Sequence, residues 1–199
     1  MQLVFASNNI NKLEQVKLLL DNDEVLMPQD IGIDDFDVVE DGLSLEENAF
    51  KKAHELYKLS KKKVFSDDTG LFVEALDGRP GIYAHRYAGE DASDKDNRNK
   101  MLEELKDSDN RKAYFKTVIC FIDDQGNDYY FEGILDGEIS TKELGDGGFG
   151  YDKIFYIEKY GKSLGQMEID FKNQISHRGL AMKEFKKFLD KKKYEDSNN

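Results

Sequence analysis

The residues from Gln2 to Leu20 read QLVFASNNINKLEQVKLLL, and this stretch decides the fold class. Gln2 to Ala6 form a short apolar run that ends at Ser7-Asn8-Asn9, the pattern of a strand entering a polar loop. Asn11 with Glu14 three residues later predicts a variant of the helix capping box. The apolar residues that follow have helical spacing: Leu13, Val16, Leu19 and Leu20.

The rest of the chain continues this alternation of strands and helices. Ser44 with Glu47 predicts the start of a second helix, Val64 and Phe65 predict a strand, and Ser93 predicts the start of a third helix. The strand at Val64 is expected to end at the polar residues 66–70. Strands that alternate with helices favour an α/β protein.

A hairpin and a last helix complete the predicted order. Two strand-like runs, Ala113–Ile122 and Tyr129–Leu135, flank the polar connection 123–127, and Ser176 is expected to cap the final helix. Helix-linked strands followed by a hairpin predict a mixed sheet, and any second lobe is expected to be formed by the sheet itself.

Length, composition and charge exclude several classes of protein. The chain has 199 residues, 39% of them hydrophobic, which predicts a single domain over residues 1–195 with a frayed tail at 196–199. A net charge of −12 disfavours nucleic-acid binding. The single cysteine, Cys120, excludes an internal disulfide framework and is expected to be a buried, inert thiol. No secretory signal or membrane-spanning run is evident, so a cytoplasmic protein is expected.

The first candidate site is the loop Ser7-Asn8-Asn9-Ile10-Asn11-Lys12, between the first strand and the first helix. A helix N-terminus presents free N–H groups and a partial positive charge, which suit a phosphate, and Lys12 adds a full charge. A simple capped turn explains the pattern equally well.

The second candidate site is Ser66-Asp67-Asp68-Thr69-Gly70. Adjacent carboxylates repel each other unless a cation or solvent offsets the repulsion, and Mg²⁺ is commonly held by one or two carboxylates with phosphate oxygens. Because neighbouring strand residues point to opposite sides, only Asp68 is expected to bind the metal, with Glu40 near another strand end as the second carboxylate. The alternative is a solvated turn.

Two further segments carry residues suited to a nucleobase. In Gly147-Gly148-Phe149-Gly150-Tyr151-Asp152, glycines allow a flat group to approach, Phe149 could stack on a base and Asp152 could contact the edge of the base. Lys172 and Ser176-His177-Arg178 place cations at a predicted helix start, where the helix dipole opposes them. The alternative for the first of these segments is a glycine-rich turn with Phe149 in the core.

Six segments occur in a characteristic order: Ser7-Asn8…Lys12, Glu47-Asn48-Ala49…Lys52, Asp67-Asp68-Thr69-Gly70-Leu71, Gly81-Ile82-Tyr83…Arg86-Tyr87-Ala88-Gly89, Gly148-Phe149-Gly150-Tyr151-Asp152 and Ser176-His177-Arg178-Gly179. Together they span residues 3 to about 185, and each alone is weak evidence. In this order they strongly resemble the inosine/xanthosine triphosphate pyrophosphatase family.

The resemblance implies a two-lobed α/β fold around a long mixed central sheet flanked by helices, with a substrate cleft between the lobes and usually a homodimer. It also implies Mg²⁺-dependent hydrolysis of the α–β phosphate bond of ITP, dITP and XTP, which releases a monophosphate and pyrophosphate and clears non-standard purines from the nucleotide pool.

The resemblance also implies roles for individual residues. Phosphate contacts fall to Ser7, Asn8, Asn9, Ile10, Asn11, Lys12 and Lys52, with Thr69 beside the phosphates. Asp68 becomes the general base and Lys12 stabilises charge in the transition state; Glu40 and Asp68 lie near the metal. The purine is expected to be surrounded by Phe149, Gly150, Tyr151, Asp152, Lys172, His177 and Arg178.

The residues also suggest how the base is selected. Lys172 and Arg178 only donate hydrogen bonds, so we expect them to favour the 6-oxo acceptor of inosine and xanthosine over the 6-amino group of adenine. Three alternatives stay open: a pyrophosphatase for modified pyrimidines or methylated bases, a nucleotide sensor without turnover, and a nucleic-acid-binding module.

Overall fold

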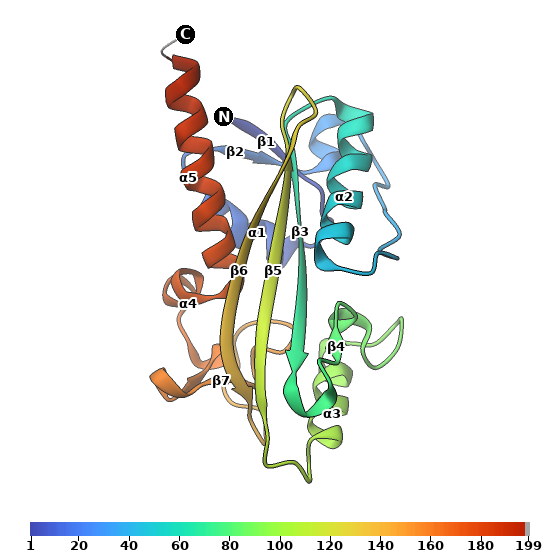
Figure 1. Ribbon diagram of the computed structural model, residues 1–199, viewed down its shortest axis with the longest axis vertical. Helices are drawn as coiled ribbons and strands as arrows, with labels where there is room; N and C mark the ends of the chain where they lie inside the picture. Colours follow the sequence, from blue (N-terminus) through green and yellow to red (C-terminus); the bar gives the residue numbers. More distant parts are fainter. Residues whose placement is uncertain (198–199) are drawn as a thin grey trace. The chain divides into compact units, whose positions relative to one another are not determined.

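The computed structural model describes residues 1–197 and contains a mixed central sheet (Figure 1). Within this range the sheet has eight strands in the order β2-β1-β3-β5-β6-β7-β8, with β4 paired to β3. The strands are β1 (Gln2–Phe5), β2 (Glu24–Leu26), β3 (Val64–Val73), β4 (Pro80–Gly81), β5 (Lys112–Ile122), β6 (Asp128–Ile139), β7 (Phe155–Ile157) and β8 (Lys162–Ser163). β1 runs parallel to β2 and β3, whereas β4, β7 and β8 pair antiparallel, so the predicted mixed sheet is confirmed.

Five helices accompany the sheet in the described part of the chain: α1 (Ile10–Leu19), α2 (Leu45–Ser60), α3 (Asp94–Glu104), α4 (Ile169–Ile175) and α5 (His177–Ser197). Local capping fixes two of the predicted starts. The side chain of Ser44 accepts a hydrogen bond from the backbone of Glu47, and Ser93 forms a capping box with Asp96. Both predicted caps are confirmed. They could be predicted because each cap bonds only to a residue close to it in the sequence.

The chain divides into two compact units, as expected for a two-lobed fold. The first unit contains Met1–Asp68, Thr117–Gly133 and the described residues from His177 onward; the second contains Thr69–Lys116 and Ile134–Ser176. Strands β3, β5 and β6 contribute residues to both units. The second lobe is therefore built on the sheet strands themselves, as the sequence predicted.

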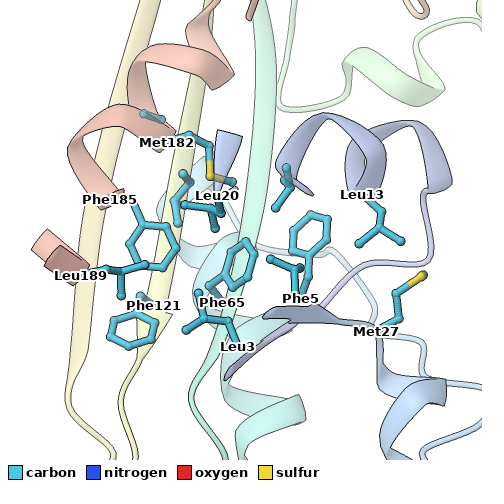
Figure 2. Close-up of a cluster of buried hydrophobic side chains, with 14 residues drawn as sticks. Leu3, Phe5, Leu13, Leu20, Met27, Phe65, Phe121, Met182, Phe185 and Leu189 are labelled. Carbon is cyan, nitrogen blue, oxygen red and sulfur yellow. The ribbon is translucent and has the colours of Figure 1, made fainter. Parts of the chain in front are cut away.

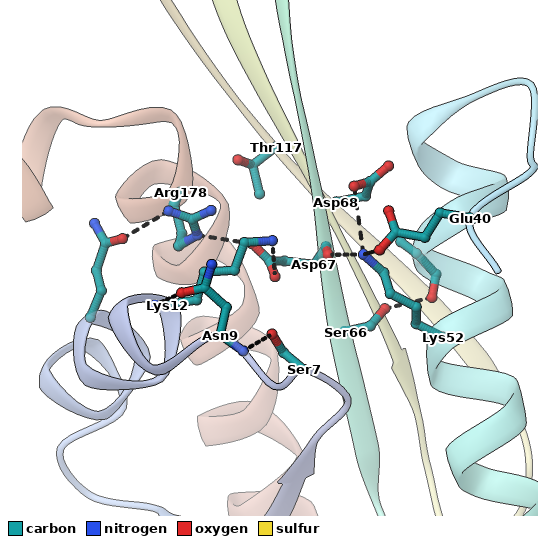
Figure 3. Close-up of polar contacts among 12 residues, drawn as sticks. Ser7, Asn9, Lys12, Glu40, Lys52, Ser66, Asp67, Asp68, Thr117 and Arg178 are labelled. Carbon is teal, nitrogen blue, oxygen red and sulfur yellow. Dashed lines mark hydrogen bonds and ion pairs between the residues drawn. The ribbon is translucent and has the colours of Figure 1, made fainter. Parts of the chain in front are cut away.

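In the first unit, α1 and α5 lie on one side of β3 and α2 lies on the other (Figure 3). An apolar cluster with stacked and tilted aromatic rings lies between the strands and helices α1 and α5 (Figure 2). The fully buried aromatic rings of this cluster are Phe5, Phe65, Phe121 and Phe185. Burial of each such side chain contributes about 1.5–3 kcal/mol, so this cluster fixes the helices that carry the polar residues described below.

The second unit has its own apolar core. Leu71 and Val73 of β3, Met101 and Leu105 of the α3 segment, and Phe155 of β7 are all fully buried in it. Phe115 packs against Phe155 with ring centroids 4.5 Å apart. A separate core allows this unit to hold its own loops in place.

Three local predictions were wrong. The polar residues 66–70 lie inside β3, not at the end of a strand, and residues 37–42 around Glu40 form no strand. The cap of α1 is Asn9, whose side chain accepts from the backbone N–H of Lys12, not Asn11. Local polarity predicted a strand end at 66–70, but Asp67 and Asp68 meet cations from distant segments and lie within the strand.

Other features agree with the sequence. Cys120 is fully buried, as expected, and burial raises the pKa of its thiol to about 12, which favours an unreactive thiol. Among residues 1–197, no helix combines the length and the apolar character that crossing a membrane requires. Helix α5 continues to Ser197, two residues beyond the expected domain end, and the last residues of the expected tail, 198–199, lie outside the described residues.

Candidate active site

Two adjacent carboxylates occupy the middle of β3 in the first unit. Asp67 and Asp68 are both buried, and their side chains leave the strand on opposite sides (Figure 3). Asp67 points toward α1 and α5, and Asp68 points toward α2. The strand therefore separates two acidic groups that would repel each other and gives each its own cations.

Asp67 is held by two cations from opposite ends of the sequence. Its Oδ1 lies 3.1 Å from Lys12 Nζ, and its Oδ2 accepts a hydrogen bond of 2.9 Å from Arg178 Nε. Burial alone would raise the pKa of Asp67, but the charges of Lys12 and Arg178 outweigh burial and hold the pKa well below its usual range. Asp67 is therefore a permanent anion that fixes these two cations.

Lys12 is positioned by the polar loop before α1. The backbone N–H of Asn9 donates to Ser7 Oγ, and the Asn9 side chain caps the helix at Lys12 (Figure 3). Burial lowers the pKa of Lys12, while Asp67 opposes this effect. An ammonium beside a helix N-terminus gives this corner the features of an anion-binding site.

On the other side of β3, Lys52 of α2 meets two carboxylates. Lys52 Nζ lies 3.1 Å from Glu40 Oε1 and 3.5 Å from Asp68 Oδ1, and it donates a hydrogen bond of 2.7 Å to the main-chain oxygen of Asp67. Burial would lower the pKa of Lys52, but Asp68 and Glu40 raise it overall. The lysine therefore stays charged between the two acidic groups.

Two hydrogen bonds between side chains and the backbone hold β3 and the Glu40 segment against α2. Ser66 Oγ donates to the main-chain oxygen of Ala49, which ties β3 to α2. The Gly42 N–H donates to Asn48 Oδ1 at 2.8 Å, and a Cβ at position 42 would lie 2.6 Å from that oxygen. Only glycine allows this close approach, which sets the Glu40 segment against α2.

Asp68 has the properties of a general base. Burial raises its pKa to about 6, with Lys52 opposing and Glu40 adding to the rise. A carboxylate with a pKa near the working pH exchanges protons efficiently. Asp68 Oδ2 is buried and has no hydrogen-bond partner among the residues that the structure describes.

The same residues fit a divalent cation. The oxygens of Glu40 and Asp68 converge on one point, which now holds the Lys52 ammonium, and Asp68 Oδ2 still needs a partner. Mg²⁺ typically takes one or two carboxylates and completes its shell with water and phosphate oxygens. Across residues 1–197 no group of three or more His, Cys, Asp or Glu is placed to hold a metal ion.

Three residues of this cluster were missed by sequence reasoning. Gln15 is buried on α1 and accepts from an Arg178 guanidinium nitrogen at 2.9 Å, and Thr117 Oγ1 lies 2.6 Å from His177 Nδ1. Asp67 itself was given no role. A polar residue one turn after Lys12 on the same helix face was the available signal for Gln15. Nothing in the local sequence indicated Thr117.

In the second unit, the predicted base-recognition loop is closed by Asp152. Its Oδ2 accepts from the backbone N–H of Phe149 at 3.1 Å and pairs with Lys172 Nζ at 2.9 Å. The Lys172 ammonium also lies 5.7 Å from the centre of the half-buried Phe149 ring. The structure therefore brings together three of the residues expected around the purine.

One prediction about these residues is wrong, and one alternative is excluded. Lys172 lies within α4, not at a helix start, because a separate short helix precedes α5. Phe149 is not a core residue, whereas Tyr151 is, since it is buried and its hydroxyl donates to the main-chain oxygen of Ala84. The backbone of Gly150 is held on both sides, by Asp94 and by Arg98.

The remaining predicted residues have simpler surroundings. Asn8 donates to the main-chain oxygen of Phe36, and Ile10, which is 59% exposed, and Asn11, which is also exposed, lie in the first turn of α1. Thr69 directly follows Asp68 in β3 and is half-buried. Arg178 lies with Asp67 and Lys12 in the first unit.

Comparison with known proteins identifies the family of this chain. A model of the Ham1 family matches residues 3–188, a range that contains every residue of the candidate site described above. The chain belongs to the Ham1 family. The structures of two Ham1 proteins are similar to it. The Ham1 protein from Staphylococcus aureus has a TM-score of 0.88 and 40% sequence identity, and the match covers 96% of this chain and 100% of that chain. The Ham1 protein from Coxiella burnetii has a TM-score of 0.88 and 32% sequence identity, and the match covers 96% of this chain and 99% of that chain.

Ham1-family relatives also match by sequence over almost their whole length. The dITP/XTP pyrophosphatase of Clostridium perfringens (strain 13 / Type A) is 45% identical over 195 residues, covering 93% of this chain and 95% of that protein. The protein of the same name from Staphylococcus aureus (strain Mu50 / ATCC 700699) is 41% identical, and the match covers 96% of this chain and 98% of that protein. The resemblance noted from the motifs alone is thereby confirmed.

Proposed function

We propose that this protein is a nucleoside triphosphate pyrophosphatase that hydrolyses dITP, ITP and XTP to the monophosphate and pyrophosphate. The observation that carries the proposal is the match of nearly the whole chain to relatives named dITP/XTP pyrophosphatase. The buried carboxylates and cations of the first unit provide the chemistry that such a reaction needs.

Asp68 is the general base of the proposed reaction. A carboxylate whose pKa is about 6 accepts a proton from water near neutral pH, and the water then attacks the α-phosphorus as pyrophosphate leaves. Lys12, fixed by Asp67, stabilises the negative charge that develops on the phosphates. Lys52, Asn9 and the backbone of residues 7–12 contact the triphosphate in the same proposal.

Glu40 and Asp68 hold Mg²⁺, the metal that best fits two carboxylates with phosphate oxygens. When bound, Mg²⁺ neutralises charge on the triphosphate. The unpartnered Asp68 Oδ2 supports this assignment.

Base recognition is assigned to Phe149, Asp152 and Lys172. An ammonium has three donors, and the bond to Asp152 uses one, so Lys172 keeps donors for an acceptor on the base. The 6-oxo group of hypoxanthine or xanthine supplies that acceptor, whereas adenine presents a donor there. The predicted contact of Arg178 with the purine stays a prediction, since its guanidinium is already hydrogen-bonded to Asp67 and Gln15.

The test is a panel of nucleoside triphosphates assayed with and without Mg²⁺. We expect dITP, ITP and XTP to give a monophosphate and pyrophosphate only with Mg²⁺, with kcat/KM at least about 100-fold above that for dATP. A diphosphate and phosphate as products, or equal hydrolysis of dATP, contradicts the proposal. Faster turnover of modified pyrimidine nucleotides favours the alternative substrate class, and binding without turnover favours a sensor.

The proposal extends to assembly and location. The family resemblance supports a homodimer, for which light scattering is expected to give twice the 22.9 kDa of one chain. A mass of one chain at micromolar concentration contradicts this. A role in clearing the nucleotide pool also implies a cytoplasmic protein.

A further inference from the structure

The Lys52 ammonium lies at the point where Glu40 and Asp68 converge. Its Nζ is 3.1 Å from Glu40 Oε1, 3.5 Å from Asp68 Oδ1 and 2.7 Å from the main-chain oxygen of Asp67 (Figure 3). The residue is 8% exposed, so solvent does little to screen these contacts. A buried cation is thus surrounded by three oxygens from β3 and the segment before α2.

The two carboxylates are the groups assigned above to the divalent cation. An ammonium and a divalent cation compete for the same pair of carboxylates, because the two positive charges repel each other at a few ångströms in a poorly solvated site. Asp68, which is 6% exposed, still has one buried oxygen without a hydrogen-bond partner within residues 1–197. The Lys52 ammonium therefore lies near one oxygen of Asp68 and leaves the other without a partner among the described residues.

The surroundings allow the side chain of Lys52 to move while its backbone stays in place. The hydrogen bond from Ser66 to Ala49 fixes α2 on β3 one turn before Lys52. Lysine carries a compact charge on a flexible four-carbon stem, so its ammonium can change partners without moving the helix. A triphosphate would offer a new anionic partner of higher charge.

We propose that Lys52 occupies the metal position of the free protein: its ammonium holds Glu40 and Asp68 together and releases them when a triphosphate provides another partner. The inference rests on the proposed function, because it takes these two carboxylates as the metal ligands. It assigns Lys52 a role beyond phosphate contact. Metal binds weakly to the free protein and strongly together with the nucleotide.

The experiment measures binding of Mn²⁺ alone, by electron paramagnetic resonance of the free ion, to the full chain without nucleotide. Lys52→Gln removes the competing charge and keeps a donor of similar size, so we expect Mn²⁺ to bind at least about tenfold more tightly than to the wild type. Lys52→Arg keeps the charge and is expected to stay within about twofold of the wild type. Lys51→Gln, which removes a neighbouring exposed lysine paired with Asp41, is the matched control and is expected to behave like the wild type.

Equal or weaker Mn²⁺ binding by Lys52→Gln overturns the inference, including the case in which neither protein binds the ion. Circular dichroism confirms that each variant is folded, and Lys52→Met gives a second neutral variant if the glutamine protein is unstable. Pyrophosphate release from dITP by the wild type reports separately on the proposed function. If the wild type hydrolyses dITP but the neutral Lys52 variants do not bind Mn²⁺ more tightly, only the role of Lys52 is refuted. If the wild type does not hydrolyse dITP, the proposed function is refuted, and the comparison of Mn²⁺ binding is still valid.

Discussion

Asp67 and Asp68 are neighbours in β3, and we expect their neutral variants to change stability in opposite directions. Asp68→Asn removes a buried carboxylate whose pKa is raised to about 6 from an ordinary 3.8. Ionisation of such a group favours the unfolded chain, where the proton is lost more easily. The variant is therefore expected to be more stable than the wild type when no metal is present.

The magnitude follows from the two pKa values. The difference between 3.8 and about 6 corresponds to about 3 kcal/mol at pH 8, at about 1.4 kcal/mol for each pH unit. The contribution of protonated Asp68 to stability is fully present below pH 3.8 and is lost as the pH rises through about 6. At pH 5 the advantage of Asp68→Asn is expected to be about half of its value at pH 8.

Asp67→Asn provides the matched comparison, since it makes the same chemical change one residue earlier. The pKa of Asp67 is lowered, so its contribution to stability is present above its ordinary pKa of 3.8 and is lost as the pH falls through the lower folded value. The variant removes the carboxylate that Lys12 and Arg178 share. Loss of one partner of a buried ion pair costs about 3–5 kcal/mol, so Asp67→Asn is expected to be destabilised at pH 8.

Urea denaturation followed by circular dichroism, at pH 5 and pH 8 with EDTA present, measures these free energies of unfolding. Pyrophosphate release from dITP, measured in parallel with Mg²⁺, is expected to be lost in Asp68→Asn despite its higher stability. The reasoning is refuted if Asp68→Asn is less stable than the wild type at pH 8, or if its advantage does not grow between pH 5 and pH 8.

Four further predictions test other parts of the site. Glu40→Gln is expected to raise the Mg²⁺ concentration for half-maximal activity at least about tenfold, and an unchanged requirement argues against Glu40 as a ligand. Lys172→Met is expected to lower the preference for dITP over dATP at least about tenfold in kcat/KM; an unchanged ratio means that Lys172 does not read the base. Gly148→Ala places a Cβ 2.3 Å from Asp152 Oδ2, at a residue whose φ is +77°. It is expected to lower the melting temperature more than Gly150→Ala, whose Cβ meets nothing within 4 Å, and equal losses of melting temperature would contradict this expectation. Cys120 is expected to resist thiol reagents at pH 8 until the protein is denatured, and rapid modification of the native protein would show that it is accessible.

Helix starts could be predicted from the sequence when the cap and its partner are close in the chain. Ser44 and Ser93 each bond to a residue three positions later, and both were identified correctly. The predicted cap, Asn11, was wrong: its spacing to Glu14 suggested a capping box, but Asn8, Asn9 and Asn11 all stand near the start of α1 and Asn9 is the cap. The choice between them depends on where the preceding strand ends, which local spacing does not specify.

The segment 66–70 shows why local polarity was misleading. Two consecutive aspartates have low strand propensity, so the end of a strand was predicted here, with a solvated turn as the alternative. In the structure they lie within β3 because each meets cations from other elements, on opposite faces of the strand. Alternation of strand side chains was nevertheless correctly used to separate Asp67 from Asp68.

The sequence alone determined the types and order of most elements, the mixed α/β class and the motifs that identify the family, because these depend on periodicity and short-range spacing. Only the tertiary structure decided which charges meet. Lys12 reaches Asp67 across 55 positions, and Arg178 reaches it across 111. Ion pairs of this kind depend on how helices pack on the sheet, and no local pattern in a single sequence encodes that packing. The same packing placed Lys52 between Glu40 and Asp68, where its charge and a metal ion would compete for the same oxygens.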